Sequence, residues 1–242
     1  MKTNKYFKEK RAGHQHKVRL FCFPYSGGNH SIYKDWELTL DKEISLVTVH
    51  LKGRVERMGE EAINNMEALV NDLFENIKAF LDEPFAFFGH SLGGLVAFAL
   101  LAKIEKETGK RATKLIVSAS KAPQIYAKNP MSDYTDETLT QKLKDYGNTP
   151  DYVLESEELM ELILPTIRAD YQLLDSYNTC QEEKLASPVV IFNCEDDVAK
   201  EVSMQWQTCT VEECSYRTFE EGHFFIHGQR DKIISEINRV LK

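Results

Sequence analysis

A serine flanked by glycines stands between an apolar run and a helical pattern, and this order constrains the fold more than any other feature. Residues Gly89 to Gly93 read Gly-His-Ser-Leu-Gly and fit the pattern Gly-x-Ser-x-Gly. The apolar run Phe85 to Phe88 precedes them, and an alanine- and leucine-rich stretch begins at Leu92. The short pattern alone is weak, because glycine and serine are common residues. A strand, a sharp turn and a helix in this order indicate a nucleophilic Ser91 on a strained turn, whose neighbours must be small.

Short apolar or β-branched runs alternate with helical patterns along most of the chain. Such runs are typical of buried parallel strands, and the alternation predicts a mostly parallel sheet covered by helices on both faces. The expected strands are Val18 to Pro24, Ile44 to Val49, Phe85 to Phe88, Leu115 to Val117, Val189 to Phe192 and Ser215 to Phe219. The expected helices are Ala62 to Leu81, Leu92 to Lys106 and Asp231 to Leu241. The predicted fold class is therefore α/β, specifically the α/β-hydrolase fold.

The rhythm of strands and helices is interrupted between residues 121 and 180. This stretch has no strand-like run, and it combines short polar-aromatic helical patterns with several acidic residues and prolines. In an α/β sheet the ligand binds beyond the carboxyl ends of the strands, so a helical insertion here is placed to act as a lid. We expect one domain over residues 1–242, with a core of about 17–120 and 181–242 and a lid of about 121–180.

Composition excludes several classes of protein. The formal charge of -8 and the pI near 5.5 argue against binding to nucleic acid or to an anionic membrane, both of which need a basic surface. The segment Met1 to Lys17 is polar and basic with no apolar run of a signal peptide after it, and we expect a cytoplasmic protein. The five cysteines include no Cys-x-x-Cys pair, so neither a disulfide framework nor a zinc site is indicated.

A serine hydroxyl needs a base to take its proton and a carboxylate to orient that base. In this fold the chain order is serine, acid, histidine, which leaves His223 and His227 as candidate bases. We favour His223, which follows the last expected strand, and interpret His227 as a surface or packing residue. Three acids follow the expected strand Val189 to Phe192, namely Glu195, Asp196 and Asp197. Their positions alone do not decide which one orients the histidine.

Developing negative charge on a substrate oxygen requires backbone N–H groups directed at it. Leu92 follows the nucleophile at a helix N-terminus and is expected to supply one. The loop after the first expected strand, Pro24 to Gly28, ends in two glycines that permit close backbone approach. We favour Tyr25 as the second donor, with Ser26 as the alternative.

At this point the chain resembles the type II thioesterases of nonribosomal peptide and polyketide synthetases, relatives of the medium-chain acyl thioesterase of fatty acid synthesis. In that family the acid lies three residues after a glycine that ends a strand. Cys194 replaces the glycine here, and counting three residues on gives Asp197, with Asp196 as the alternative. A second departure is Lys52, which stands where the family usually has proline. The resemblance rests on Leu20 to Gly28, Gly53-Arg54 with Arg57 and Glu60, Pro84 to Gly94, Leu164 to Tyr171, and Glu221 to Phe224.

The resemblance implies a substrate and a partner. The substrate is an acyl group held as a thioester on the phosphopantetheine arm of an acyl- or peptidyl-carrier protein, and the task is to clear wrong or stalled acyl groups. It implies no metal and no cofactor, since phosphopantetheine belongs to the substrate, and we expect a monomer. The alternatives are a carboxylesterase or lipase with the same three residues, and a binding protein without catalysis.

Two further hypotheses concern charged residues. A carrier protein is commonly acidic, so docking requires a local basic patch. Arg168 and Asp170 are hypothesised to pair within the expected lid or at its hinge. The candidates for the basic patch are Lys121, Lys128, Arg54 and Arg57.

Overall fold

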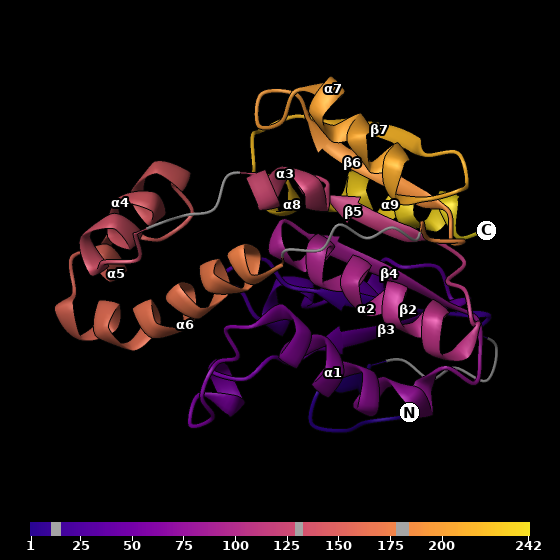
Figure 1. The fold of residues 1–242 in the computed structure, drawn as a ribbon, viewed down its shortest axis with the longest axis horizontal. Helices are drawn as coiled ribbons and strands as arrows, with labels where there is room; N and C mark the ends of the chain where they lie inside the picture. The colour runs from indigo at the N-terminus through magenta and orange to yellow at the C-terminus, as the bar shows by residue number, and fades with distance from the viewer. Residues whose placement is uncertain (11–15, 129–132, 178–183) are drawn as a thin grey trace.

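The computed structural model describes residues 1–10, 16–128, 133–177 and 184–242. Within these residues seven strands form one sheet in the order β1-β3-β2-β4-β5-β6-β7 (Figure 1). Strands β2 to β7 are parallel, and β1 pairs with β3 in the antiparallel direction. The strands are β1 (Phe7–Glu9), β2 (Val18–Phe23), β3 (Ile44–Val49), β4 (Phe85–His90), β5 (Leu115–Ser118), β6 (Val189–Cys194) and β7 (Ser215–Phe219). The predicted fold class is confirmed, as are the six predicted strands.

Strand β1 was not predicted from the sequence. It has three residues, too few to show a periodic pattern, and it lies at the edge of the sheet. Phe7 and Glu9 are buried while Lys8 between them is partly exposed, which is the alternation of a strand with one face on the core. Glu9 is accommodated because its carboxylate accepts from Arg19 Nε at 3.0 Å and from Ser45 Oγ at 2.9 Å.

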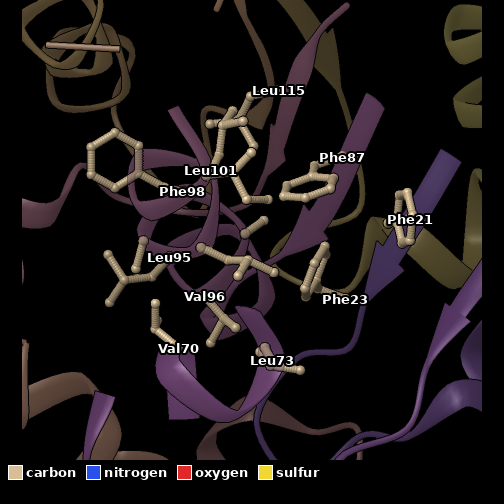
Figure 2. Packing of buried hydrophobic residues seen from close by; sticks show 14 of the residues in the cluster. Phe21, Phe23, Val70, Leu73, Phe87, Leu95, Val96, Phe98, Leu101 and Leu115 are labelled. Carbon is tan, nitrogen blue, oxygen red and sulfur yellow. The ribbon is translucent and has the colours of Figure 1, made fainter. Parts of the chain in front are cut away.

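Helices cover both faces of the sheet, as the alternating pattern predicts. One core cluster joins α1 (Met66–Ile77) and α2 (Leu92–Thr108) to one set of strand side chains, and the other joins α9 (Arg230–Val240) to the alternate set. Figure 2 shows Phe23 and Phe87 of two neighbouring strands pointing toward the helix residues Leu95 and Val96. Every strand residue from β2 to β6 is buried, because the sheet is covered on both sides.

Between β5 and β6, the described residues form four helices joined by loops. Figure 1 shows α4, α5 and α6 at one end of the molecule, beside the sheet rather than over its centre. Here α6 has 20 residues and includes Pro165, so it is longer than the short helices that the sequence indicated. The helices are α3 (Pro123–Lys128), α4 (Asp136–Tyr146), α5 (Asp151–Leu154) and α6 (Glu157–Ser176). The predicted end of the insertion near residue 180 lies outside the described residues.

Shorter elements complete the chain. Two short helices, α7 (Lys200–Ser203) and α8 (Phe225–Gly228), follow β6 and β7. Among the helices of the described residues, none has the length and apolar character needed to cross a bilayer. The 3-10 helices are η1 (His30–Tyr33), η2 (Trp36–Leu38), η3 (Val55–Arg57), η4 (Lys78–Phe80) and η5 (Met204–Cys209).

Candidate active site

Ser91 lies on the sharp turn between β4 and α2. Its backbone has φ 52° and ψ -120°, a strained conformation for a residue with a side chain. The turn is held by the Ser91 N–H, which donates to Ser118 O at 2.8 Å. A methyl group on Gly89 would lie 2.1 Å from Gly93 O, and one on Gly93 would lie 2.2 Å from Phe23 O. Both glycines of the motif are therefore required by close backbone approach.

The loops after β6 and β7 bring the predicted acid and base to Ser91. His223 Nε2 lies 3.1 Å from Ser91 Oγ, and His223 Nδ1 lies 2.7 Å from Asp197 Oδ2. The side chains of His223 and Asp197 are each 16% exposed, so the pair is shielded but reachable from solvent. The parallel pairing of β5, β6 and β7 places these loops at the same edge of the sheet as Ser91. The structure thus assembles a Ser91–His223–Asp197 hydrogen-bonded chain.

The two other acids of the β6 loop do not take part in this chain. Glu195 and Asp196 are exposed, whereas Asp197 is turned inward. The turn forms because the N–H groups of Asp197 and Val198 donate to Cys194 O at 3.1 and 3.0 Å. Cys194 therefore supports the acid loop in the position where the resembled family has glycine.

His90 braces the backbone of His223. The imidazole of His90 is fully buried, with Nε2 2.9 Å from His223 O and Nδ1 2.9 Å from Ser118 Oγ. Burial holds the pKa of His90 well below its ordinary value, so the ring is neutral. A neutral ring has one N–H, and the carbonyl of His223 can only accept, so Nε2 donates and Nδ1 accepts from Ser118. From the sequence, His90 was not predicted to have a role beyond its place in the motif.

His227 does not contact the hydrogen-bonded chain. Its Nε2 lies 2.9 Å from the hydroxyl of Tyr25, and Asn148 Nδ2 donates to the same hydroxyl at 3.3 Å. The ring of Tyr25 also packs against Phe224 with centroids 5.0 Å apart. His227 therefore fixes the Tyr25 side chain, which agrees with a packing role.

The loop from Tyr25 to Gly28 is a tight turn next to Ser91. Gly28 N–H donates to Tyr25 O at 2.9 Å, and Gly27 has φ 71°, which favours glycine. Within the described part of the chain, the N–H groups of Tyr25 and Leu92 donate to no protein acceptor. Both predicted donors are thus free to bind an oxygen of a ligand.

A cavity of about 660 Å³ contains Ser91 and extends to both sides of it. On the β3 side its wall is formed by Ile32, Val55 and Met58, and on the other side by Tyr126 and Val198. Its remaining wall comes from the helices between β5 and β6. These helices and their loops contribute Leu143, Tyr146, Asn148, Val153, Leu162, Ile163, Ile167 and Tyr171.

One residue of these helices reaches the hydrogen-bonded chain directly. The ring of Tyr146, the last residue of α4, lies 5.1 Å from the ring of His223, centroid to centroid. Burial, followed by the charge of Asp197, raises the pKa of Tyr146, so its hydroxyl stays protonated. The helices between β5 and β6 therefore form part of the surroundings of the His223 ring.

The hypothesis of a basic patch is wrong for two of its four residues. Arg54 is 8% exposed and Arg57 is 6% exposed. Arg57 is held by Glu60, with Nε to Oε1 at 2.6 Å. Lys121 is exposed and lines the cavity, while the side chain of Lys128 lies outside the described residues.

The hypothesised pair of Arg168 and Asp170 is also wrong. Arg168 donates to Asp136 and to Tyr134 O. Asp170 is fully buried and accepts from Arg54 Nη2 at 2.7 Å. Residues two apart on a helix point in different directions, which explains why they find different partners.

A further cluster of titratable groups lies on the β3 side of the cavity. The rings of His30 and His50 stack with centroids 4.0 Å apart, and both approach the carboxylate of Glu56. Lys8 Nζ also contacts Glu56 at 2.5 Å. Burial, with a further contribution from His30, lowers the pKa of His50 to about 4. Sequence reasoning set these histidines aside on chain order and did not foresee their association.

The strand order, the turn at Ser91 and the chain of Ser91, His223 and Asp197 define an α/β-hydrolase. The family model of the thioesterase domain matches residues 18–241, and the chain belongs to this thioesterase family. Enzymes of this kind hydrolyse thioesters, so the protein is a thioester hydrolase.

Individual relatives match most or all of the chain. The gramicidin S biosynthesis protein GrsT of Aneurinibacillus migulanus is 32% identical over 243 residues, covering 99% of this chain and 95% of GrsT. The type II thioesterase BorB from the borrelidin biosynthetic cluster superposes with a TM-score of 0.88 at 28% identity, covering 100% of both chains. The RedJ thioesterase from the prodiginine biosynthetic pathway in Streptomyces coelicolor gives a TM-score of 0.85 at 27% identity, covering 93% of this chain and 86% of RedJ.

Proposed function

We propose that this protein is a type II serine thioesterase that removes acyl groups from the phosphopantetheine arm of carrier proteins in nonribosomal peptide or polyketide synthesis. The observation that carries the proposal is the hydrogen-bonded chain of Ser91, His223 and Asp197 inside a cavity of a thioesterase fold. Support for the pathway comes from relatives of gramicidin S and borrelidin biosynthesis.

Acylation begins with proton transfer. Asp197 accepts from His223 Nδ1–H at 2.7 Å, which leaves the lone pair of Nε2 facing Ser91 Oγ at 3.1 Å. As Ser91 Oγ bonds to the thioester carbon, His223 takes the hydroxyl proton. The carbonyl oxygen becomes negative and is met by the N–H groups of Leu92 and Tyr25, with Ser26 as the alternative to Tyr25.

Collapse of the intermediate breaks the carbon–sulfur bond. The thiol has a pKa near 8.5, so it departs nearly as the thiolate and takes its proton from His223. Water, deprotonated by His223, then attacks the acyl-Ser91 ester and releases the carboxylic acid. The net reaction consumes one thioester and one water and yields one acid and one thiol. These steps need no metal or cofactor, since the three residues supply nucleophile, base and orienting group.

The residues of the cavity walls support a proposed placement of the two parts of the substrate. The thiolate must depart next to His223, so the pantetheine arm lies on the side of β6 and β7, where Lys121 and Tyr126 line the cavity. The acyl group then extends to the opposite side, toward the apolar residues Ile32, Val55 and Met58. We further propose that the helices between β5 and β6 act as a lid within a single monomeric, cytoplasmic domain.

The test compares acyl groups on a phosphopantetheinyl carrier protein with the same groups as free thioesters. Acetyl, medium-chain and long-chain groups are offered to wild type and to Ser91→Ala. We expect faster hydrolysis from the carrier, and loss of all turnover in Ser91→Ala. Preferential release of wrong or stalled groups in a reconstituted synthetase supports the clearing task.

Equal or faster hydrolysis of simple oxygen esters, without a gain from the carrier, would instead identify a general carboxylesterase.

A further inference from the structure

A buried ion pair joins three segments that are distant in the sequence. Arg54 Nη2 donates to Asp170 Oδ1 at 2.7 Å, although the two residues are 116 positions apart. Arg54 lies just after β3, and Asp170 lies on α6. Asp170 is fully buried and Arg54 is 8% exposed, so neither charge is solvated on its own.

The same two side chains hold the loop that follows β2. Asp170 Oδ2 accepts the N–H of Gly27 at 2.7 Å, and Arg54 Nη1 donates to Gly28 O at 2.8 Å. The two oxygens of Asp170 thus serve two different donors. Together with the turn bond from Gly28 N–H to Tyr25 O, these contacts fix each peptide between Tyr25 and Gly28.

A contribution to the stability of the fold does not explain well why this buried ion pair is present. Removing two charges from water costs free energy that offsets their attraction, so a buried ion pair is a weak source of stability. Its contacts are instead geometrically demanding, because each charge-assisted bond tolerates little rotation of its partner. The contacts fall on Gly27 N–H and Gly28 O, in the turn that is closed by the bond from Gly28 N–H to Tyr25 O. A small rotation of this turn would therefore also move Tyr25, the expected oxyanion donor, and redirect its N–H.

We propose that Arg54 and Asp170 are positioning residues that set the direction of the Tyr25 N–H. Because Asp170 lies on α6, this direction then depends on how α6 packs on the core. The oxyanion site is then complete only when α6 packs on the core, so the helices that cover the cavity also complete its chemistry. This inference rests on the proposed serine mechanism.

The first test is Asp170→Asn, measured with a free acyl thioester. The substitution keeps the shape but replaces one acceptor oxygen by an N–H₂ group, which then faces either Gly27 N–H or Arg54, both donors. We expect kcat to fall by about 10- to 100-fold, because a misdirected oxyanion donor stabilises the negative charge of the transition state less well. We expect KM to stay within about threefold, since the ground-state carbonyl depends little on these donors.

A trifluoromethyl ketone analogue of the substrate separates positioning from general damage. Its adduct with Ser91 carries an oxyanion, so its inhibition constant is expected to rise by the same factor by which kcat falls. A fall in kcat with unchanged analogue affinity would overturn the inference, as would wild-type kcat in Asp170→Asn.

Two further variants keep the test decisive if Asp170→Asn folds poorly. Arg54→Lys retains the positive charge but cannot serve Gly28 O and Asp170 together, so it is expected to show the same pattern at a smaller size. Arg168→Gln is the matched control, because it removes an ion pair from the same helix without touching the Tyr25 loop. Its kcat and analogue affinity are expected to match wild type.

The outcomes also separate this inference from the proposed function. If Ser91→Ala keeps its activity, the serine mechanism fails. If Ser91→Ala is inactive and both Asp170→Asn and Arg54→Lys behave as wild type, the mechanism stands and only the positioning role fails.

Discussion

His90 Nε2 lies 2.9 Å from the backbone oxygen of His223, so one buried histidine holds the segment that presents the other. The bond needs a neutral His90 that donates from Nε2 and accepts from Ser118 at Nδ1. Protonation would put a second donor on the ring and would place a charge in a fully buried site. The position of His223 thus depends on the charge state of the ring of His90, the motif residue next to Ser91.

Stability is expected to fall as the pH is lowered, in part through His90. Burial keeps the pKa of folded His90 well below its ordinary 6.5, so below that pH the unfolded chain binds more protons than the folded chain. The stabilising contribution is present above about pH 6.5 and is lost as the pH falls, by up to about 1.4 kcal/mol per pH unit. Urea unfolding at pH 7.5, 6.5 and 5.5 measures the slope, which is expected to decrease in His90→Gln.

The protonation of His50 also makes the stability fall as the pH is lowered. Because burial lowers the pKa of His50 to about 4, its contribution continues to be lost down to about pH 4. His50→Gln is therefore expected to reduce the slope further. An unchanged slope in both variants would contradict the assignment of neutral buried rings.

Asp197→Asn is expected to lower kcat by about 10⁴-fold at neutral pH, because an amide can donate to His223 and stabilise the wrong tautomer. The neighbouring exposed acid provides the matched control, and Asp196→Asn is expected to retain wild-type activity. Steady-state hydrolysis of a free thioester, with circular dichroism to check the fold, measures both. Inactivity of the Asp196 variant alone would transfer the role of the acid to Asp196.

Gly93→Ala is expected to destabilise the protein by about 3 kcal/mol or more, because its methyl group meets backbone that cannot move aside. The new carbon would lie 2.2 Å from Phe23 O and 2.7 Å from Pro24 O. Gly59→Ala is the control, since no atom lies within 4 Å of the added carbon there. Urea unfolding of both variants compares them, and a stable Gly93→Ala would contradict the close approach of β2 and α2.

Met58→Trp is expected to shift the preference toward short acyl groups. Met58 lines the apolar side of the cavity and is 48% exposed, so an indole there narrows the outer end of the proposed acyl path. The kcat/KM for a long-chain thioester is expected to fall about tenfold, with acetyl turnover within about twofold of wild type. Leu38→Trp, at a site that is 78% exposed and remote from the cavity, is the control.

Equal losses for acetyl and long-chain thioesters in Met58→Trp would place the acyl group elsewhere in the cavity.

The elements that the sequence predicts well are those whose signal is local. The strand–turn–helix around Ser91 is visible because an apolar run, two glycines and a helical stretch are contiguous. Strand β7 was predicted with its bounds, and β4 and β6 each extend two residues beyond the prediction. These extensions carry His90 and Cys194, polar or small residues that a pattern of apolar side chains does not include.

The elements that the sequence predicts poorly depend on contacts across the fold. Position alone does not distinguish Asp197 from Asp196, because the path of a loop leaves no periodic pattern. Neither does the sequence show that Arg54 pairs with Asp170, since each looks like an ordinary surface charge until the sheet and α6 bring them together. The catalytic roles of the assembled residues remain predictions, which the variants above test.

The residues of the hydrogen-bonded chain lie in loops that are far apart in the sequence, so the ribosome synthesises them at different times. Ser91 precedes His223 by 132 residues, and His223 follows β7, the strand that pairs with β6 at the edge of the sheet. In the proposed mechanism, a growing polypeptide can therefore contain Ser91 long before it contains the histidine that deprotonates the hydroxyl, and it is expected to be inactive toward thioesters until then. In refolding experiments the proposed mechanism makes the return of hydrolysis a reporter for the pairing of β7 with β6, which a spectroscopic signal of total helix or sheet content does not single out.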